Sequence, residues 1–180
     1  AIALALLQVL VRMYRPSEAL LGIVPGREGY NDLRLSDDAK PVPGVVIYRF
    51  DAPLLFFNAD YFKARVLSLV DDATPRPRWF VFDAEAVSQL DTTGAQVVDD
   101  LVDALRARGV EFILARPKLF MRKYGQQMGL GGKIGAENIF PSVHAAVGAI
   151  LGVALLRIIP GTSSSPLLAL FIPISLAVIG

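Results

Sequence analysis

Short apolar runs alternate with amphipathic runs between residues 42 and 151. Runs rich in β-branched and aromatic residues predict buried strands at 45–50, 79–83 and 111–115. A shorter extended piece is predicted at 138–140. Amphipathic runs after Asn58 or Asp60, after Asp91, from Pro117 and from Val143 predict helices. Because strands alternate with helices, we expect an α/β fold with a mixed, mostly parallel sheet of about four to five strands flanked by helices.

The strand at 79–83 leads into the turn Leu90-Asp91-Thr92-Thr93-Gly94, which opens a helix. Asp91, Thr92 and Thr93 are favourable N-cap types, because a side-chain oxygen can accept a backbone N–H that the first helical turn leaves unpaired. The apolar side chains after the turn share one helical face: Val98, Leu101, Val102 and Leu105. A pair of hydroxyls is therefore expected at the positive end of a helix, close to the end of a buried strand.

Both ends of the chain are apolar. Residues 1–11 contain Gln8 as their only polar side chain, and Arg12 and Arg15 follow directly. Eleven helical residues rise about 16 Å, about half of a bilayer core. We expect residues 1–15 to be the end of a transmembrane helix with the arginines on the cytoplasmic side, and an amphipathic helix packed on a soluble core is the alternative.

The rest of the chain divides by composition. Prolines and glycines interrupt residues 16–41, which predicts a linker with at most a short strand near 33–35. Residues 42–151 form the predicted domain. Residues 152–180 are an apolar C-terminal extension of unknown role, for which a membrane-dipping hairpin, a truncated span and a segment foreign to the domain all stay open.

Composition narrows the range of functions. The apolar fraction of 53% and the mean hydropathy of +0.48 indicate contact with a membrane. A net charge of +1 without a basic cluster argues against a nucleic-acid partner. The absence of cysteine and the single histidine, His144, leave little basis for a metal site or a catalytic triad. We expect no catalytic residues, no metal and no cofactor.

Three further groups are ambiguous. Asp51 and Asp83 follow strands, where a phospho-receiver domain would place an acidic cluster, but the cluster is incomplete and we interpret both as solvated. The glycines of Gly129–Gly132 lack the context of a phosphate-binding loop and are interpreted as a helix stop.

The basic residues Arg116, Lys118, Arg122 and Lys123 suit either a solvated face or a contact with anionic lipid headgroups or a partner.

Three segments together resemble the C-terminal STAS domain of SulP-type anion transporters. They are VPGVVIYRFDAPLLFFNADYF at 42–62, LDTTG at 90–94 and NIFPSVHAAV at 138–147. Upstream, Arg15-Pro16 and LGIVPG at 21–26 resemble the linker between the last transmembrane helix and that domain. The resemblance implies a STAS fold on the cytoplasmic side of the cell membrane, joined to the membrane domain of the same transporter, usually as a homodimer.

The resemblance also implies a role for the turn. In the soluble relatives, the anti-sigma factor antagonists, the second hydroxyl of an Asp-Ser-Ser-Gly motif accepts phosphate, and the matching residue here is Thr93. Threonine keeps the hydroxyl but adds a methyl group and a stiffer side chain. Three interpretations of the chain stay open: the regulatory and dimerisation domain of a transporter of sulfate, bicarbonate or a similar small anion; a soluble phospho-switch that binds a kinase; and a small-molecule module built on Asp91–Gly94. For the turn itself, simple capping by Asp91, Thr92 and Thr93 is the alternative to a switch.

Overall fold

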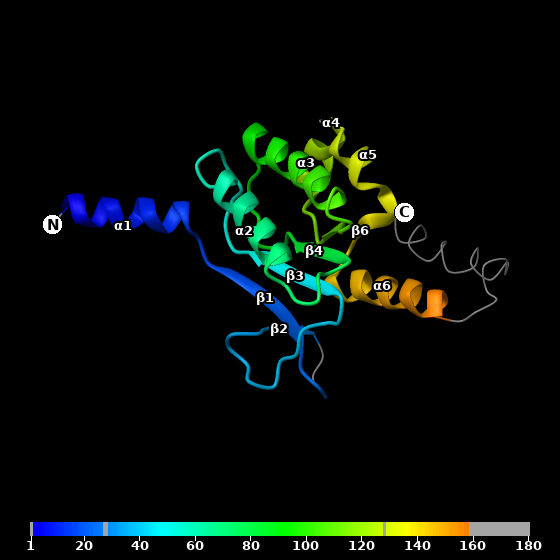
Figure 1. Ribbon diagram of the computed structural model, residues 1–180. Helices are drawn as coiled ribbons and strands as arrows, with labels where there is room; N and C mark the ends of the chain where they lie inside the picture. Colours follow the sequence, from blue (N-terminus) through cyan, green and yellow to red (C-terminus); the bar gives the residue numbers. More distant parts are fainter. Residues whose placement is uncertain (1, 27–28, 128, 159–180) are drawn as a thin grey trace. The chain divides into compact units, whose positions relative to one another are not determined.

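The computed structural model describes residues 2–26, 29–127 and 129–158 (Figure 1). The chain divides into two compact units, Ala1–Ala146 and Val147–Gly180. The sheet and the helices packed on it belong to the first unit. The last described helix, α6 (Val143–Ile158), begins in the first unit and ends in the second.

The first unit contains one six-stranded mixed sheet in the order β2-β1-β3-β4-β5-β6. Its strands are β1 (Glu18–Ile23), β2 (Tyr30–Asp32), β3 (Val45–Phe50), β4 (Trp79–Asp83), β5 (Glu111–Ala115) and β6 (Ile139–Phe140). Strands β3 to β6 are parallel, and β1 runs antiparallel to both β2 and β3. The predicted α/β class and the mostly parallel sheet are confirmed.

The strand count is higher than the expected four to five, because residues expected to form a linker supply β1 and β2. The short strand expected near 33–35 lies instead at Tyr30–Asp32. Sequence periodicity is weak in β1, which contains Gly22, and its extended form depends on pairing with β3. A Cβ on Gly22 would lie 2.5 Å from the Lys40 carbonyl oxygen, so the glycine permits a close backbone approach.

Helices connect the parallel strands. Helix α2 (Ala59–Asp71) joins β3 to β4, and α3 (Thr92–Arg106) joins β4 to β5. Helices α4 (Leu119–Gln127) and α5 (Leu130–Ile134) and a 3-10 turn (Ala136–Asn138) lie between β5 and β6. Gly129, at φ +74°, is well placed to end a helix, but Gly131 and Gly132 lie inside α5, so the interpretation of the whole stretch as a helix stop was wrong.

Helices α2 and α3 lie side by side on one face of the sheet (Figure 1). Aromatic rings fill the space beneath them, with Phe62 of α2 at 4.9 Å from Phe82 and 5.2 Å from Phe50 between ring centroids. The apolar face predicted for α3 is buried: Val98, Leu101, Val102 and Leu105. Every residue of β4 is buried, as its continuous apolar run predicts for a central parallel strand. This packing fixes the positions of the helix ends that form the candidate site.

Helix α1 (Ile2–Tyr14) has no buried residue. Its large apolar side chains are between 46% and 79% exposed. Among the described residues, no helix combines the length and the apolarity needed to cross a membrane. Most of the apolar extension expected at 152–180 lies outside the described residues, which reach Ile158 within α6.

Candidate functional site

The candidate site is the turn at the start of α3. Asp91 is the N-cap residue, and its Oδ1 accepts a hydrogen bond from the Gly94 backbone N–H at 2.7 Å. Its second carboxylate oxygen, Oδ2, accepts one from the Phe56 backbone N–H at 2.8 Å. A single side chain therefore caps α3 and holds the loop that follows β3, 35 residues earlier in the chain.

Gly94 is buried where that loop crosses the helix. A Cβ at this position would lie 2.4 Å from the Leu54 carbonyl oxygen, a distance that no side chain can tolerate. Leu54 also donates its N–H to the Gln89 carbonyl at 3.0 Å and pairs with Leu90 as an isolated parallel bridge. The glycine is thus required by the close approach of two backbone segments, in addition to its place in the turn.

Thr92 and Thr93 form the first turn of α3, and both are exposed. The N-terminal position places their hydroxyls at the positive end of the helix dipole. A phosphate at Thr93 would gain from this position and would be repelled by the Asp91 carboxylate two residues away. The exposure of Thr93 allows an enzyme to reach its hydroxyl.

A second polar group lies where β4 and β5 end. Asp83, the last residue of β4, is fully buried, which corrects the interpretation of this residue as solvated. Its carboxylate accepts hydrogen bonds from Arg116 Nε at 2.9 Å and from Nη2 at 2.5 Å. The interpretation was wrong because Arg116, 33 residues away in sequence, supplies the pairing that makes burial of the charge tolerable.

Arg116 is held by more than this pair. Its guanidinium also contacts Glu85, and its backbone N–H donates to the Phe140 carbonyl at 2.9 Å. Its φ of +56° is in the left-handed region, which costs a non-glycine residue about 1–3 kcal/mol. The hydrogen bonds to Asp83 raise the pKa of Arg116 above its usual value. Pairing on the side chain therefore offsets strain in the backbone.

The four basic residues that the sequence groups together, either as a solvated face or as a contact, are separated by this pairing. Arg116 points to Asp83 and Glu85, whereas Lys118, Arg122 and Lys123 are exposed. Leu119 lies among the three exposed cations and is itself 66% exposed. The surface available to anionic partners is therefore made of Lys118, Arg122 and Lys123.

Sequence reasoning missed a cluster around Glu18 in β1. Its carboxylate accepts from the Tyr48 hydroxyl at 2.7 Å, the Tyr61 hydroxyl at 3.3 Å and Arg65 Nε at 2.6 Å. Burial, and after it the bond to Glu18, raises the pKa of Tyr48 far above its usual value. The only sequence signal is an acidic residue at the head of an apolar run.

Sequence reasoning also missed a structural role for Asn58, which was noted only as a helix cap. Its side chain makes no capping bond to α2. It is 1% exposed and is one of only two buried polar residues in the described part of the chain, the other being Asp83. Its bonds run to the 53–57 loop and to the end of α1.

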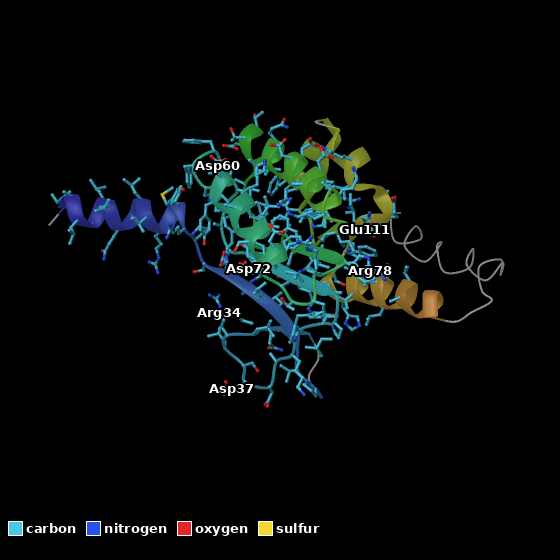
Figure 2. The ribbon with its side chains drawn as sticks, in the orientation of Figure 1. Arg34, Asp37, Asp60, Asp72, Arg78 and Glu111 are labelled. Atoms are coloured by element: carbon cyan, nitrogen blue, oxygen red, sulfur yellow. The ribbon has the colours of Figure 1, made fainter. Side chains whose placement is uncertain are left out.

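The third interpretation is a small-molecule module built on the turn, but the hollow described next does not lie at the turn. A hollow of about 270 Å³ is lined by Arg106, Glu111 and Asn138, among other residues. It lies at the amino ends of the parallel strands, where Figure 2 places Arg78 and Glu111, and the turn lies at their carboxyl ends, beyond β4. No group of three or more potential metal ligands occurs in the residues that the structure describes.

The fold places the chain in a class of α/β domains with known structures. Murine Slc26a9, an anion transporter, gives a TM-score of 0.73 at 22% identity, covering 83% of this chain and 24% of that one. The STAS domain of a SulP transporter from Vibrio cholerae gives 0.55 at 17% identity, covering 64% of this chain and 88% of that one. At these identities the likeness concerns the fold alone.

The family follows from the sequence match. The family model described as the STAS domain matches residues 38–146, more than half of the chain. The chain belongs to the STAS domain family.

Curated relatives include a probable sulfate transporter of Mycobacterium tuberculosis, which is 40% identical over 147 residues. A high affinity sulfate transporter of the plant Stylosanthes hamata is 29% identical over 155 residues. Each alignment covers 82% of this chain but only 26% and 23% of the respective relatives. The chain therefore spans about a quarter of the length of the relatives that it matches.

Proposed function

We propose that this chain is the regulatory and dimerisation domain of a secondary transporter of a small anion, together with the end of the transmembrane helix that precedes it. The observation that carries the proposal is the family match at 38–146 combined with relatives named as sulfate transporters, of which this chain corresponds to about a quarter. Under this proposal the chain binds its own membrane domain and performs no catalysis, and sulfate is the first anion to test.

The character of α1 supports attachment to a membrane. Its apolar side chains are exposed on all sides, as expected for a helix whose partners are lipid or other apolar helices. Arg12 and Arg15 stand at its C-terminal end, which favours the cytoplasmic side by the positive-inside tendency. The domain would then lie beneath the bilayer, with Lys118, Arg122 and Lys123 available to anionic headgroups.

Fractionation of the source cells tests the attachment. An antibody raised against residues 42–151 should detect a band several times heavier than the 19.4 kDa of this sequence, and the band should stay with membranes after an alkaline wash. Sulfate uptake by that protein, with and without the domain, then tests the regulatory role. An antigen of small mass in the soluble fraction would contradict the proposal.

A second candidate is a phospho-switch at Thr93 that is controlled by a kinase. It is favoured by the exposure of Thr93 in the first turn of α3 and by the fold likeness to the anti-sigma factor antagonist SpoIIAA, at a TM-score of 0.50 and 20% identity. Intact-mass analysis of the native protein, with Thr93→Val as control, tests it. Absence of phosphate under all growth conditions would leave the turn with a capping role only.

A further inference from the structure

The last turn of α1 rests on the first turn of α2. An α-helix leaves its last four carbonyl groups without partners inside the helix, and the Met13 carbonyl is one of these. Asn58 Nδ2, just before α2, donates to that carbonyl at 3.4 Å. One turn further along, the Tyr61 ring lies 6.1 Å from the Tyr14 ring, with the Arg15 guanidinium at 5.9 Å from its centroid. The end of α1 is thus located by two residues at the start of α2.

Asn58 is also the centre of the loop that precedes it. Its Oδ1 accepts from the Leu55 N–H at 2.9 Å, and its Nδ2 donates to the Pro53 carbonyl at 2.9 Å. Because Asn58 is buried, these bonds have no competing water and a displaced loop would leave amide groups unpaired. Movement of the loop therefore requires movement of the Asn58 side chain.

The other side of the same loop is attached to the turn at Thr93. Phe56, next to Leu55, donates its N–H to Asp91 Oδ2, and Leu54 lies against Gly94. Asp91 itself caps α3 through Gly94, the residue after Thr93. The loop is consequently hydrogen-bonded on one side to the turn that contains Thr93 and on the other side to the end of α1.

We propose that residues 53–58 couple the turn at Asp91–Gly94 to the last turn of α1. A new negative charge at Thr93 repels the Asp91 carboxylate and competes with it for backbone N–H donors. The Phe56 N–H is then released and the loop loosens. Asn58 then loses its fixed position, and with it the contact to Met13. The state of an exposed turn is in this way transmitted to the helix that we expect to lead into the membrane domain.

The biological use of this coupling rests on the regulatory role proposed above. It is tested in the 180-residue chain without a transport assay, so its failure and the failure of the transporter assignment remain distinguishable. Coupling between two sites is reciprocal, which allows the test to run in both directions.

The forward test compares Asp91→Asn with Asp99→Asn by amide hydrogen exchange of the chain in nonionic detergent. Asparagine is as good an N-cap as aspartate, but an amide has one acceptor oxygen, so Asp91→Asn keeps the cap and loses the Phe56 bond. We expect exchange in residues 11–15 to rise about threefold to tenfold, the effect of losing one ordinary hydrogen bond. Asp99→Asn makes the same charge change on α3, where the carboxylate pairs with Lys133, and should leave residues 11–15 unchanged.

The reverse test uses Tyr14→Ala, an exposed position where truncation does not threaten the fold. Loosening the end of α1 should speed exchange of the Phe56 amide by a similar factor. In an Asn58→Asp background, which keeps the acceptor for Leu55 but loses the donor to Met13 and Pro53, Asp91→Asn should have no additional effect on α1. Faster exchange at Phe56 in Asp91→Asn with unchanged exchange at residues 11–15 would overturn the coupling, as would an unchanged Phe56 amide in Tyr14→Ala.

Discussion

Asp83 and Asp91 are two aspartates near the carboxyl ends of the parallel strands, and each accepts two short hydrogen bonds. Asp83 is fully buried and takes its two short bonds from the guanidinium of Arg116, with a longer one from the Glu85 backbone N–H at 3.3 Å. Asp91 is partly exposed and takes both of its bonds from backbone amides, those of Phe56 and Gly94. The bonds of Asp83 make its charge compatible with the core. The bonds of Asp91 join two backbone segments at the edge of the core. The difference suggests that Asp83 serves mainly stability, whereas Asp91 can serve a change of state.

The largest expected effect is at Asp83. Asp83→Ala removes the charged hydrogen bonds to Arg116, which keeps Glu85 as a partner, and should lower the free energy of unfolding by about 1.5–3 kcal/mol. The matched control is Asp51→Ala, which breaks the partly exposed pair with Arg49 and should cost less than about 1 kcal/mol. Urea unfolding followed by the fluorescence of Trp79, the only tryptophan, measures both. Equal losses in the two variants would remove the distinction between core and surface pairs.

At Asp91 we expect an intermediate effect. Asp91→Ala removes the N-cap of α3 and the acceptor for Phe56, and should lower the free energy of unfolding by about 1–2 kcal/mol. Asp91→Asn keeps the cap and should cost less than Asp91→Ala in the same urea experiment. A loss at Asp91→Ala as large as that at Asp83→Ala would show that the turn belongs to the core and would weaken its assignment as a switch.

The Glu18 cluster provides a third carboxylate, whose partners can be titrated. Burial, followed by the bond to Glu18, raises the pKa of Tyr48, so the folded chain favours the neutral phenol. This contribution to stability is fully present below the usual tyrosine pKa of about 10 and is lost as the pH rises above it. We expect the free energy of unfolding to fall with pH above about 10.

Tyr48→Phe should flatten that alkaline fall, because it removes the titrating hydroxyl. Tyr14→Phe, which alters an exposed tyrosine outside the Glu18 cluster, should leave the fall unchanged. Urea unfolding at several pH values between 8 and about 11 measures the slope in both variants. A slope that is the same in Tyr48→Phe and in the unsubstituted chain would contradict the raised pKa of Tyr48 as the cause of the alkaline fall.

The smallest effect on stability is expected at the exposed basic surface. Replacement of Lys118, Arg122 and Lys123 by Gln should change the free energy of unfolding by about 0.5 kcal/mol or less per residue. The same variant should bind anionic liposomes less tightly, since each charge near the headgroups contributes about 1 kcal/mol. Co-sedimentation with anionic and with neutral vesicles measures this. Unchanged binding to the anionic vesicles would leave these residues as a solvated face.

Much of the fold was predictable because local pattern and final structure agree. The strands β3, β4 and β5 and the helix α3 lie where apolar runs and capping residues place them. Strand β1 was not predicted and β2 was expected a few residues later in the chain, since their extended form depends on pairing and not on periodicity. The turn at Asp91–Gly94 was recognisable from residue types alone, because capping is a local interaction between residues three apart.

The α/β class, the buried strands, the amphipathic face of α3 and the turn with its pair of hydroxyls follow from the sequence alone. Only the tertiary structure decided the partners of the polar side chains. Asp83 meets Arg116, Asp91 meets Phe56 and Asn58 meets Met13 across 33, 35 and 45 residues of chain. The physical reason is that periodicity and capping reflect interactions between residues a few positions apart. The partner of a buried polar side chain is instead a distant group, which the packing of the sheet and helices brings within hydrogen-bond distance.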